Sequence, residues 1–372
     1  MTATTDKRMQ AREAWARYCD ELRKAGDQFL RTDFPIDDLD LSEGLRYLAR
    51  LTSTSIDRNV EGANPAKPFL YMMCNEHVKV GGDNPDNRYY AAPVSAAHRY
   101  VLRGDFRRCN YFSVVTTGRV DGSEAITSGS ISGDSCKRLP DGTTEICVGR
   151  EPFGTNHVAM DDRTSTLILR CTIEEPGDKD VRPLLTRIDG TDPEVLTLEG
   201  VSSALQNSAR FVSNVSRFFA GWMADFQKWK NQLPLYPDQA YLIAIGGDPN
   251  IKYYWGSWEL RPGEALILST RKVPKATTWN CQLCNAWLES LDYTFAQIHL
   301  NSRTAAYDDD GGVTMIVADS DPGHPNWLQT LGHAHGALCM RLVGASEPMA
   351  VDARVVSLGE ARQLAKHLKD HS

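Results

Sequence analysis

The sequence lacks most of the short motifs that identify common enzyme classes. No glycine-rich loop follows a predicted strand and opens a helix, so neither a dinucleotide-binding fingerprint nor a phosphate-binding loop is predicted. Residues 129–133 have the outline of a nucleophile elbow, but Ile131 stands at the centre and no helix is predicted to follow. The helical zinc motif of metalloproteases is missing too. We therefore expect no organic cofactor.

Basic clusters and long apolar runs are also missing. The 372 residues carry 41 Lys and Arg against 48 Asp and Glu, a formal net charge of -7. Phosphate backbones attract clustered Lys and Arg, so nucleic-acid binding is not expected. No stretch approaches the ~20 apolar residues that span a bilayer, and the N-terminus has no apolar signal-peptide core. The nine Cys have no framework spacing, so we expect reduced thiols in a cytoplasmic protein without membrane contact.

Hydrophobic patterning divides the chain into four parts. Residues 1–62 and 191–234 carry apolar side chains at three- and four-residue steps, which predicts a helical N-terminal segment and a helical connector. Ser42 is expected to cap the second N-terminal helix. Residues 63–190 and 235–372 contain short β-rich runs between Gly, Asp, Asn and Pro clusters, as in antiparallel sandwiches. We predict a mainly β protein with two β-sandwich domains.

Polar side chains alternate along the predicted strand at residues 279–285. Asn280, Gln282 and Cys284 share one face, because successive side chains of a strand point to opposite sides. Cys281 falls on the other face, so Cys281 and Cys284 cannot present both thiols to one zinc ion, and no second pair completes four ligands. Asn280 and Gln282 are candidates for the lining of a ligand pocket. An outer sheet face in contact with solvent is the alternative.

His333 and His335 form the sharpest local feature. In an extended chain both imidazoles project to one side, about 7 Å apart at Cβ, and the alternation adds Cys339 and Arg341 to that face. Metal binding, a metal-free catalytic role and structural hydrogen bonding remain open for the pair. The residues of this strand that should face the core are Leu338, Met340 and Leu342.

Further candidate contacts lie in three neighbouring segments. His299 and Asn301 alternate onto one face of a predicted strand, for which an exposed edge strand is the alternative interpretation. Trp327 follows a loop with two Pro and is expected to anchor it. Glu289 and Tyr293 either supply acid–base groups at a pocket mouth or belong to an ordinary surface turn. Aromatic residues are frequent in this half of the chain: Tyr253, Tyr254, Trp255, Trp258, Trp279 and Trp287.

Several of these segments together resemble the bacterial family catalogued as domain of unknown function 1214. The matching stretches are residues 208–212, 279–293 and 321–343, and residues 84–114 resemble the upstream part of the combined 1254 and 1214 architecture. The resemblance implies a jelly-roll-like sandwich at the C-terminus, preceded by another β domain, and it implies no activity. His333 matches a common family position, whereas His335 stands where a charged residue such as Glu is more usual.

Three functional hypotheses follow. The first is a catabolic lyase or hydrolase without an organic cofactor, acting on a small hydrophobic or oxygenated molecule in a pocket of the C-terminal sandwich. His333 would act as general acid or base beside His335, and Arg341 would stabilise an anion. The second is a non-catalytic protein that binds a carbohydrate or another small ligand on aromatic rings. The third is an enzyme with a divalent metal held by His333, His335 and a third ligand.

The first hypothesis also predicts the residues that contact the substrate. A small molecule is the expected partner, and a homo-oligomer remains open. The sequence also leaves open whether the pocket lies within the C-terminal domain or between the two domains. The predicted contacts are Asn280, Gln282, His299, Asn301, Trp255, Trp258, Trp327 and Tyr293.

Overall fold

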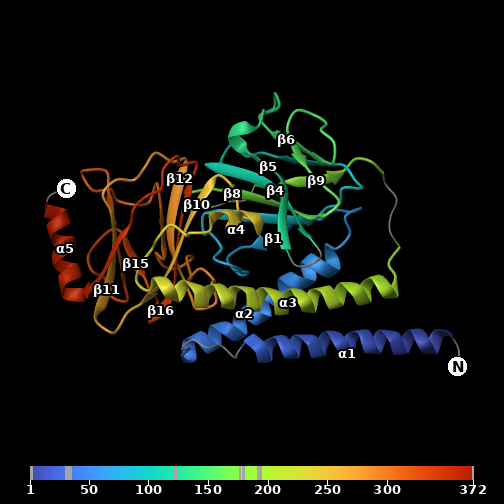
Figure 1. Cartoon of the computed structure of the whole chain (residues 1–372), viewed down its shortest axis with the longest axis horizontal. Coiled ribbons are helices and arrows are strands. Elements are labelled where there is room, and N and C mark those ends of the chain that lie inside the picture. Colours follow the sequence, from blue (N-terminus) through green and yellow to red (C-terminus); the bar gives the residue numbers. More distant parts are fainter. Residues whose placement is uncertain are drawn as a thin grey trace.

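The structure, a computed structural model, is mainly β with helices at the N-terminus and in the connector, as the sequence predicts, and with one more helix at the C-terminal end (Figure 1). It describes residues 3–29, 36–120, 124–175, 177, 181–190 and 195–370. Within these ranges, no helix is both long enough and apolar enough to cross a membrane.

Three long helices, α1 (Ala3–Phe29), α2 (Asp38–Ile56) and α3 (Leu198–Phe226), lie along one side of the two β units (Figure 1). A shared apolar cluster packs them together, with Val212 of α3 and Trp287 of the C-terminal unit at its centre. The minor helices are η1 (Asp57–Glu61), η2 (Gly133–Ser135), η3 (Gln227–Trp229) and α4 (Gln239–Ala244).

The second helix begins earlier than expected, and Ser42 does not cap it. The Asp37 carboxylate accepts hydrogen bonds from the backbone N–H groups of Leu39 and Asp40, and the Asp40 carboxylate accepts from the backbone N–H of Asp37. This reciprocal capping box satisfies more free N–H groups than a single serine does. Ser42 lies inside the helix and donates to the Asp38 carbonyl at 2.8 Å.

The first β unit is built from two sheets with the strand orders β1-β2-β8-β4-β5 and β7-β6-β3-β9. Tyr90, Leu169 and Phe112 belong to the core between them. Tyr89 and Arg170 occupy the opposite face of the five-stranded sheet, because side chains alternate along each strand. The strands are β1 (Tyr71–Cys74), β2 (Asn87–Pro93), β3 (Tyr100–Gly104), β4 (Tyr111–Val120), β5 (Glu124–Ser132), β6 (Thr144–Gly149), β7 (His157–Ala159), β8 (Thr164–Thr172) and β9 (Leu184–Arg187).

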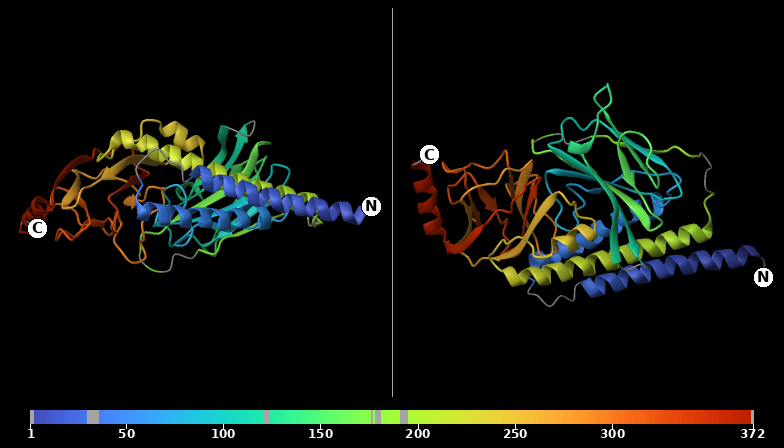
Figure 2. Two further views of the ribbon diagram at one scale, coloured as in Figure 1. Left: turned by 90° about the horizontal axis from the view of Figure 1, so that it is seen from below. Right: turned by 45° about the horizontal axis from the view of Figure 1, so that its top comes forward.

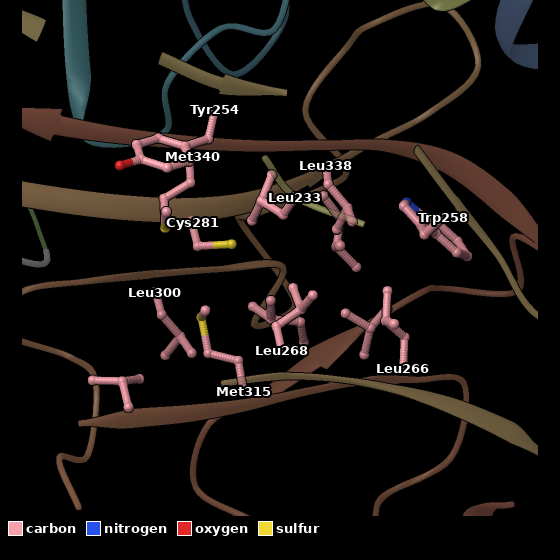
Figure 3. Packing of buried hydrophobic residues seen from close by; sticks show 14 of the residues in the cluster. Leu233, Tyr254, Trp258, Leu266, Leu268, Cys281, Leu300, Met315, Leu338 and Met340 are labelled. Carbon is pink, nitrogen blue, oxygen red and sulfur yellow. The ribbon is translucent and has the colours of Figure 1, made fainter. Parts of the chain in front are cut away.

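The C-terminal unit is a sandwich of two four-stranded sheets, ordered β10-β16-β12-β13 and β15-β14-β11-β17. Figure 3 shows its core, where Cys281, Leu338 and Met340 of one sheet face Leu268 and Met315 of the other. The closing helix α5 (Leu358–Asp370) packs on the outer face of the second sheet. The strands are β10 (Ile251–Glu259), β11 (Glu264–Thr270), β12 (Thr278–Cys284), β13 (His299–Asn301), β14 (Val313–Ala318), β15 (Trp327–Gln329), β16 (His335–Val343) and β17 (Asp352–Ser357).

The outer face of the β10-β16-β12-β13 sheet packs against the first β unit and is not open to solvent. Asn280, Gln282 and Arg341 on this face are 3%, 0% and 6% exposed. Figure 2 shows from two further directions that the two β units adjoin along the helical layer. The alternation predicted for β12 and β16 is therefore confirmed, but a solvent-wetted outer face is wrong.

Candidate functional site

Six polar or sulfur-bearing side chains form two rows across the outer face of three neighbouring strands. Strand pairing places Asn280 of β12 between Arg341 of β16 and Asn301 of β13. The next row places Gln282 between Cys339 and His299. Since paired residues of adjacent strands point to the same side, the rows make one polar surface.

The loop between β1 and β2 of the first unit covers this polar surface. The Arg341 guanidinium donates to the Gly82 carbonyl, and Gln282 Nε2 donates to the Asp83 carbonyl at 2.6 Å. The amides of Asn84 and Asn280 bond reciprocally, at 3.1 and 3.4 Å. The site therefore lies between the two β units, the second of the two locations that the sequence left open.

Two glycines let this loop approach the C-terminal unit closely. Gly81 and Gly82 have φ angles of 65° and 69°, a left-handed conformation that residues with a Cβ rarely adopt. A Cβ on Gly81 would overlap the Phe219 ring, and one on Gly82 would overlap the Trp255 ring. Glycine at both positions is required by the backbone conformation and by the space available.

An imidazole–carboxylate pair closes the covered surface at its edge. His299 Nε2 of β13 lies 3.2 Å from Asp86 Oδ1, which ends the loop of the first unit. Asn301 Nδ2 donates to the same carboxylate oxygen at 2.9 Å. The other ring nitrogen, His299 Nδ1, is buried and has no hydrogen-bond partner among the described residues. Asp86 thus orients Nε2, while Nδ1 has no hydrogen-bond partner among the described residues.

Tyr293 and Lys79 lie beside this pair. The Tyr293 and His299 rings meet edge to face, with centroids 6.3 Å apart. Burial, reinforced by the nearby Asp83 carboxylate, raises the pKa of Tyr293, so its phenol keeps its proton at neutral pH. The Lys79 ammonium lies 4.6 Å from the centroid of the Tyr293 ring and donates to the carbonyls of Ser290 and Leu291. Burial also lowers the pKa of Lys79.

His333 and His335 contact helix α2 instead of this surface. His333 Nε2 lies 2.9 Å from Glu43 Oε2, and its Nδ1 bonds to the Thr330 carbonyl at 2.8 Å. His335 Nε2 forms an ion pair of 3.0 Å with Asp40 Oδ2, without the alignment of a good hydrogen bond. Both nitrogens of His333 are therefore occupied, which leaves neither for a substrate.

The structure separates the three residues that the sequence suggested as one catalytic group. His335 and Arg341 are six positions apart on β16, which corresponds to about 20 Å along an extended strand. His333 precedes the strand and is further from Arg341 still. A small molecule cannot contact all three. The alternation placed them on one side of the strand, but it carries no information on how far apart they are.

The suggested aromatic contacts also lie in different places. Trp258 is fully buried in the sandwich core, and Trp327 donates from Nε1 to the Ala318 carbonyl beneath α5. Trp255 alone among these three lies on the covered surface, where the Arg341 guanidinium is 5.7 Å from its ring centroid. Trp255 itself stacks on Phe226 of α3. None of the three is an open platform for a sugar ring.

Metal ligation gains no support from the described part of the chain. No three His, Cys, Asp or Glu side chains within it are grouped as a metal ion would need. Cys281 faces the sandwich core while Cys284 faces α3, as the alternation predicts. The partners of His333 and His335 are the carboxylates of α2, and an ion pair explains this arrangement.

Four acidic residues of this region were not predicted as functional. Asp83 lies in the Gly-Gly-Asp-Asn-Pro segment at residues 81–85, which the sequence indicates only as a turn, and Asp86 follows it. Asp40 and Glu43 belong to α2, about 290 positions before their histidine partners. Two Gly, an Asp, an Asn and a Pro followed by Asp86 were the available signal for the loop. No local signal identifies the helix residues as partners.

A cavity of about 390 Å³ lies elsewhere, at one end of the C-terminal unit. It is bordered by α4, the start of β10 and the turn after β16. None of the predicted catalytic or substrate-contacting residues lines it. Its lining residues are Gln239, Ile243, Pro249, Asn250, Ile251, Lys252, Gly344, Ala345 and Ser346.

Comparison with known proteins agrees with the C-terminal resemblance. Residues 262–347 match the model of a family described as "Protein of unknown function (DUF1214)". A crystal structure of a putative uncharacterized protein from Burkholderia cenocepacia is 38% identical, with a TM-score of 0.89, over 93% of this chain and 97% of that one. The VPA0106 protein from Vibrio parahaemolyticus is 12% identical, with a TM-score of 0.49, over 84% and 98% of the two chains. No curated protein matches the sequence.

Proposed function

The chain belongs to the DUF1214 family, and from its site geometry we propose that it is an acid–base enzyme acting on a small oxygenated molecule. The proposed reaction is hydrolysis or elimination without an organic cofactor, as in the first sequence hypothesis. The sequence hypothesis assigns the general base to His333 and the pocket to the C-terminal sandwich. We assign the base instead to His299 and the site to the interface of the two β units. The single observation that carries this proposal is the unpartnered Nδ1 of His299.

The hydrogen bonds of His299 define which nitrogen can accept a proton. Asp86 accepts a hydrogen bond from Nε2, so the neutral ring carries its proton there and Nδ1 keeps a lone pair. Asn301 holds the same carboxylate oxygen and is itself fixed, since its Oδ1 accepts the backbone N–H groups of Arg303 and Thr304 at 3.0 Å each. A carboxylate that orients an imidazole in this way also stabilises the imidazolium formed after proton transfer.

Tyr293 is the matching proton donor in this proposal. Its phenol stays protonated because burial raises its pKa, so it can donate to a leaving group or to a developing oxyanion. A base and an acid that approach one substrate from neighbouring positions are what hydrolysis and elimination require. The His299 side chain is 19% exposed at the sheet edge, but its Nδ1 is buried, so a substrate must displace part of the covering loop to reach this nitrogen. The free state of all nine Cys supports a reducing, cytoplasmic setting.

Turnover of two substrate panels tests the assignment. A set of p-nitrophenyl esters reports hydrolysis, and a set of hydroxy acids, followed by ultraviolet absorbance of the unsaturated product, reports elimination. We expect the wild-type protein to turn over members of one panel, and His299→Gln to lower the rate by about 10²-fold or more. His98→Gln is the matched control, because His98 also faces a carboxylate, Asp189, at 3.5 Å but lies in the first β unit.

Two results would contradict the proposal. One is an unchanged rate in His299→Gln, which would show that another group transfers the proton. The other is the absence of turnover above an equal concentration of free imidazole in both panels. A loss of rate in His98→Gln equal to that in His299→Gln would point to a general effect of removing imidazoles, and would count against the assignment as well.

A further inference from the structure

Each β unit presents a tyrosine–arginine pair toward the other. Tyr89 of β2 lies directly opposite Arg170 of β8 on the outer face of the first sheet. Tyr253 of β10 lies directly opposite Arg341 of β16 on the outer face of the C-terminal sheet. Paired residues of neighbouring strands point to the same side, so each sheet carries one phenol beside one guanidinium.

The two pairs face one another across the interface. Tyr111 of the first unit packs with Ile251 and Val343 of the second, and its hydroxyl donates to Asp248 Oδ2 at 2.8 Å, which brings the two outer faces together beside the pairs. Burial raises the pKa of Tyr89 to about 12, and the charges of Arg341 and Arg170 both oppose that rise. Burial raises the pKa of Tyr253 as well, again against both guanidiniums. The guanidinium of the opposite unit thus acts on the pKa of each phenol.

Neither arginine has an acidic partner in contact among the described residues. Arg341 is 6% exposed, and it donates to the neutral oxygens of Gln282 and Gly82. Arg170 donates to the Gly246 carbonyl, while its Nη1 is buried without any hydrogen-bond partner. Most buried arginines are paired with a carboxylate, because an unpaired charge in a low-dielectric interior is costly. Arg341 is buried and Arg170 is half-buried, and their position in one place without a carboxylate in contact indicates that a negative group belongs between them.

The surrounding hydroxyls add free donors. The Tyr89 oxygen accepts the Asn84 N–H at 3.3 Å, and the Tyr253 oxygen accepts the Asp248 N–H at 2.8 Å. Each phenolic proton therefore remains available for another acceptor. Ser113 of β4 is paired with Arg170 in the same row and is 2% exposed, and its buried hydroxyl lies beside that of Tyr111.

The Asp83 carboxylate interacts electrostatically with Arg341, but its oxygens are already hydrogen-bonded to Ser290. Its two oxygens accept hydrogen bonds from the backbone N–H and the hydroxyl of Ser290, at 2.9 and 2.8 Å. Burial raises the pKa of Asp83, and Lys79 and Arg341 counteract that effect from a distance. Asp83 offsets part of the positive charge, as does the buried Asp248 carboxylate that accepts from Tyr111 and acts on Tyr253. Neither carboxylate fills the donors of the two Tyr–Arg pairs.

We propose that a small oxyanion, a carboxylate or a phosphate group, binds between the Tyr89–Arg170 pair and the Tyr253–Arg341 pair. The guanidinium fork matches the two oxygens of such a group, and the two phenols complete its hydrogen bonds. Bound there, the anion links the two β units. Arg341 is separated from His299 by two strand spacings and by two residues along the strand, about 12 Å in all, so this site is distinct from the proposed acid–base pair.

Thermal unfolding of the full chain at fixed ionic strength tests this site. Chloride is replaced stepwise by acetate in one series and by inorganic phosphate in another, so the two series separate the two oxyanion classes. A ligand that binds only the folded state raises Tm once its concentration exceeds Kd, and the rise then grows with the logarithm of that concentration. We expect such a rise of Tm in at least one series for the wild type, with the apparent Kd at least about tenfold weaker in Arg170→Gln and in Tyr253→Phe.

Two controls make the outcome decisive. Arg103→Gln removes an exposed arginine that pairs with Asp141 on the surface, and it should respond like the wild type. His299→Gln should respond like the wild type as well, which separates this site from the acid–base pair. Tyr253→Phe removes only one hydroxyl, so it still tests the site if Arg170→Gln does not fold. No Tm rise in the wild type with either anion, or the same rise in every variant, would overturn the proposal.

Discussion

His333 Nε2 lies 2.9 Å from Glu43 Oε2, although 290 positions separate the two residues in the chain. Together with His335 and Asp40, this contact attaches the N-terminal helix α2 to the turn that precedes β16. The Glu43 carboxylate also accepts a hydrogen bond from Asn285 at 2.8 Å. Asn285 is followed by Ser290 and Tyr293, which lie at the interface of the two β units. The helix and the proposed site are therefore joined through one continuous set of contacts.

The stability of the protein should depend on pH through these two ion pairs. Burial acts to lower the pKa of His333, but the hydrogen bond and charge of Glu43 outweigh it and raise that pKa. The Asp40 carboxylate, 3.0 Å from Nε2, likewise raises the pKa of His335. For Glu43 and Asp40, burial acts to raise the pKa, and the histidines reverse this and lower it.

The sign of each contribution follows from these directions. The histidine contribution is complete below their unfolded pKa of about 6.5 and is lost as pH rises through the raised folded values. The carboxylate contribution is complete above about pH 4.5 and is lost as pH falls through the lowered folded values. We expect maximum stability between about pH 4.5 and 6.5. Urea unfolding of the wild type should show a fall in unfolding free energy from pH 6 to pH 9.

His333→Gln isolates the contribution of the buried pair. The variant should lose about 1–3 kcal/mol near pH 6, because Glu43 loses the hydrogen bond and charge of His333 and keeps only Arg46 and Asn285, and its stability should change less between pH 6 and pH 9. His98→Gln, in which the lost imidazole faces Asp189 of the first β unit, is the comparison. A fall between pH 6 and pH 9 that is equally steep in wild type and His333→Gln would contradict this explanation.

Gly82→Ala should destabilise the protein more than Gly263→Ala does. Both glycines have positive φ angles, 69° and 83°, so the backbone strain of an alanine is similar. A Cβ on Gly82 would overlap the Trp255 ring, whereas nothing lies within 4 Å of one on Gly263. We expect a cost of about 1 kcal/mol at Gly263 and about 2 kcal/mol more at Gly82, measured by urea unfolding. Equal costs would mean that the loop does not press against the C-terminal unit.

Asp86→Asn should lower activity with little loss of stability. The amide keeps the size of the carboxylate but no longer stabilises an imidazolium at His299, so we expect about a 10²–10⁴-fold fall in rate on the substrate panels. Asp189→Asn, beside His98, should leave the rate unchanged. Activity retained in Asp86→Asn would show that the carboxylate does not serve the imidazole.

Native thiol labelling should distinguish the cysteines by their burial. Cys19 on α1 is exposed and should react first with a disulfide reagent such as dithiobis(nitrobenzoate). Cys281 and Cys284 are buried, and burial raises the pKa of each, so both should react only after unfolding. Cys339 should behave in the same way, with its pKa raised to about 11. Fast native labelling of Cys281 or Cys284 would contradict their placement on either side of β12.

Local patterning was enough to predict which side chains share a face. The two-residue period of β12 correctly placed Cys281 on the face opposite Asn280 and Gln282, and the structure shows that Cys281 lies in the sandwich core with Trp279 and Leu283. What covers the opposite face could not be predicted, because the covering loop lies about 200 positions earlier in the chain. A pattern that alternates with period two is the same whether its polar side meets solvent or another domain.

The prediction for His333 and His335 shows a second limit. Two histidines at alternate positions of an extended segment indicate a shared direction, and the sequence supports that inference. Their partners decide what they do, and Asp40 and Glu43 come from a helix whose stripe of acidic residues is typical of a solvated first turn. His299 was predicted as a substrate contact on weaker grounds, and Asp86, its carboxylate partner, was not identified.

The protonation state of His299 tests the central claim most directly. In protein labelled with ¹⁵N at its nine histidines, the His299 signals are identified by their loss in His299→Gln, and long-range ¹H–¹⁵N correlation shows which ring nitrogen carries the proton. We predict the Nε2–H tautomer with an unprotonated Nδ1, since Asp86 accepts from Nε2. A proton fixed on Nδ1 at neutral pH would contradict the account, because His299 would then have no free base to offer a substrate.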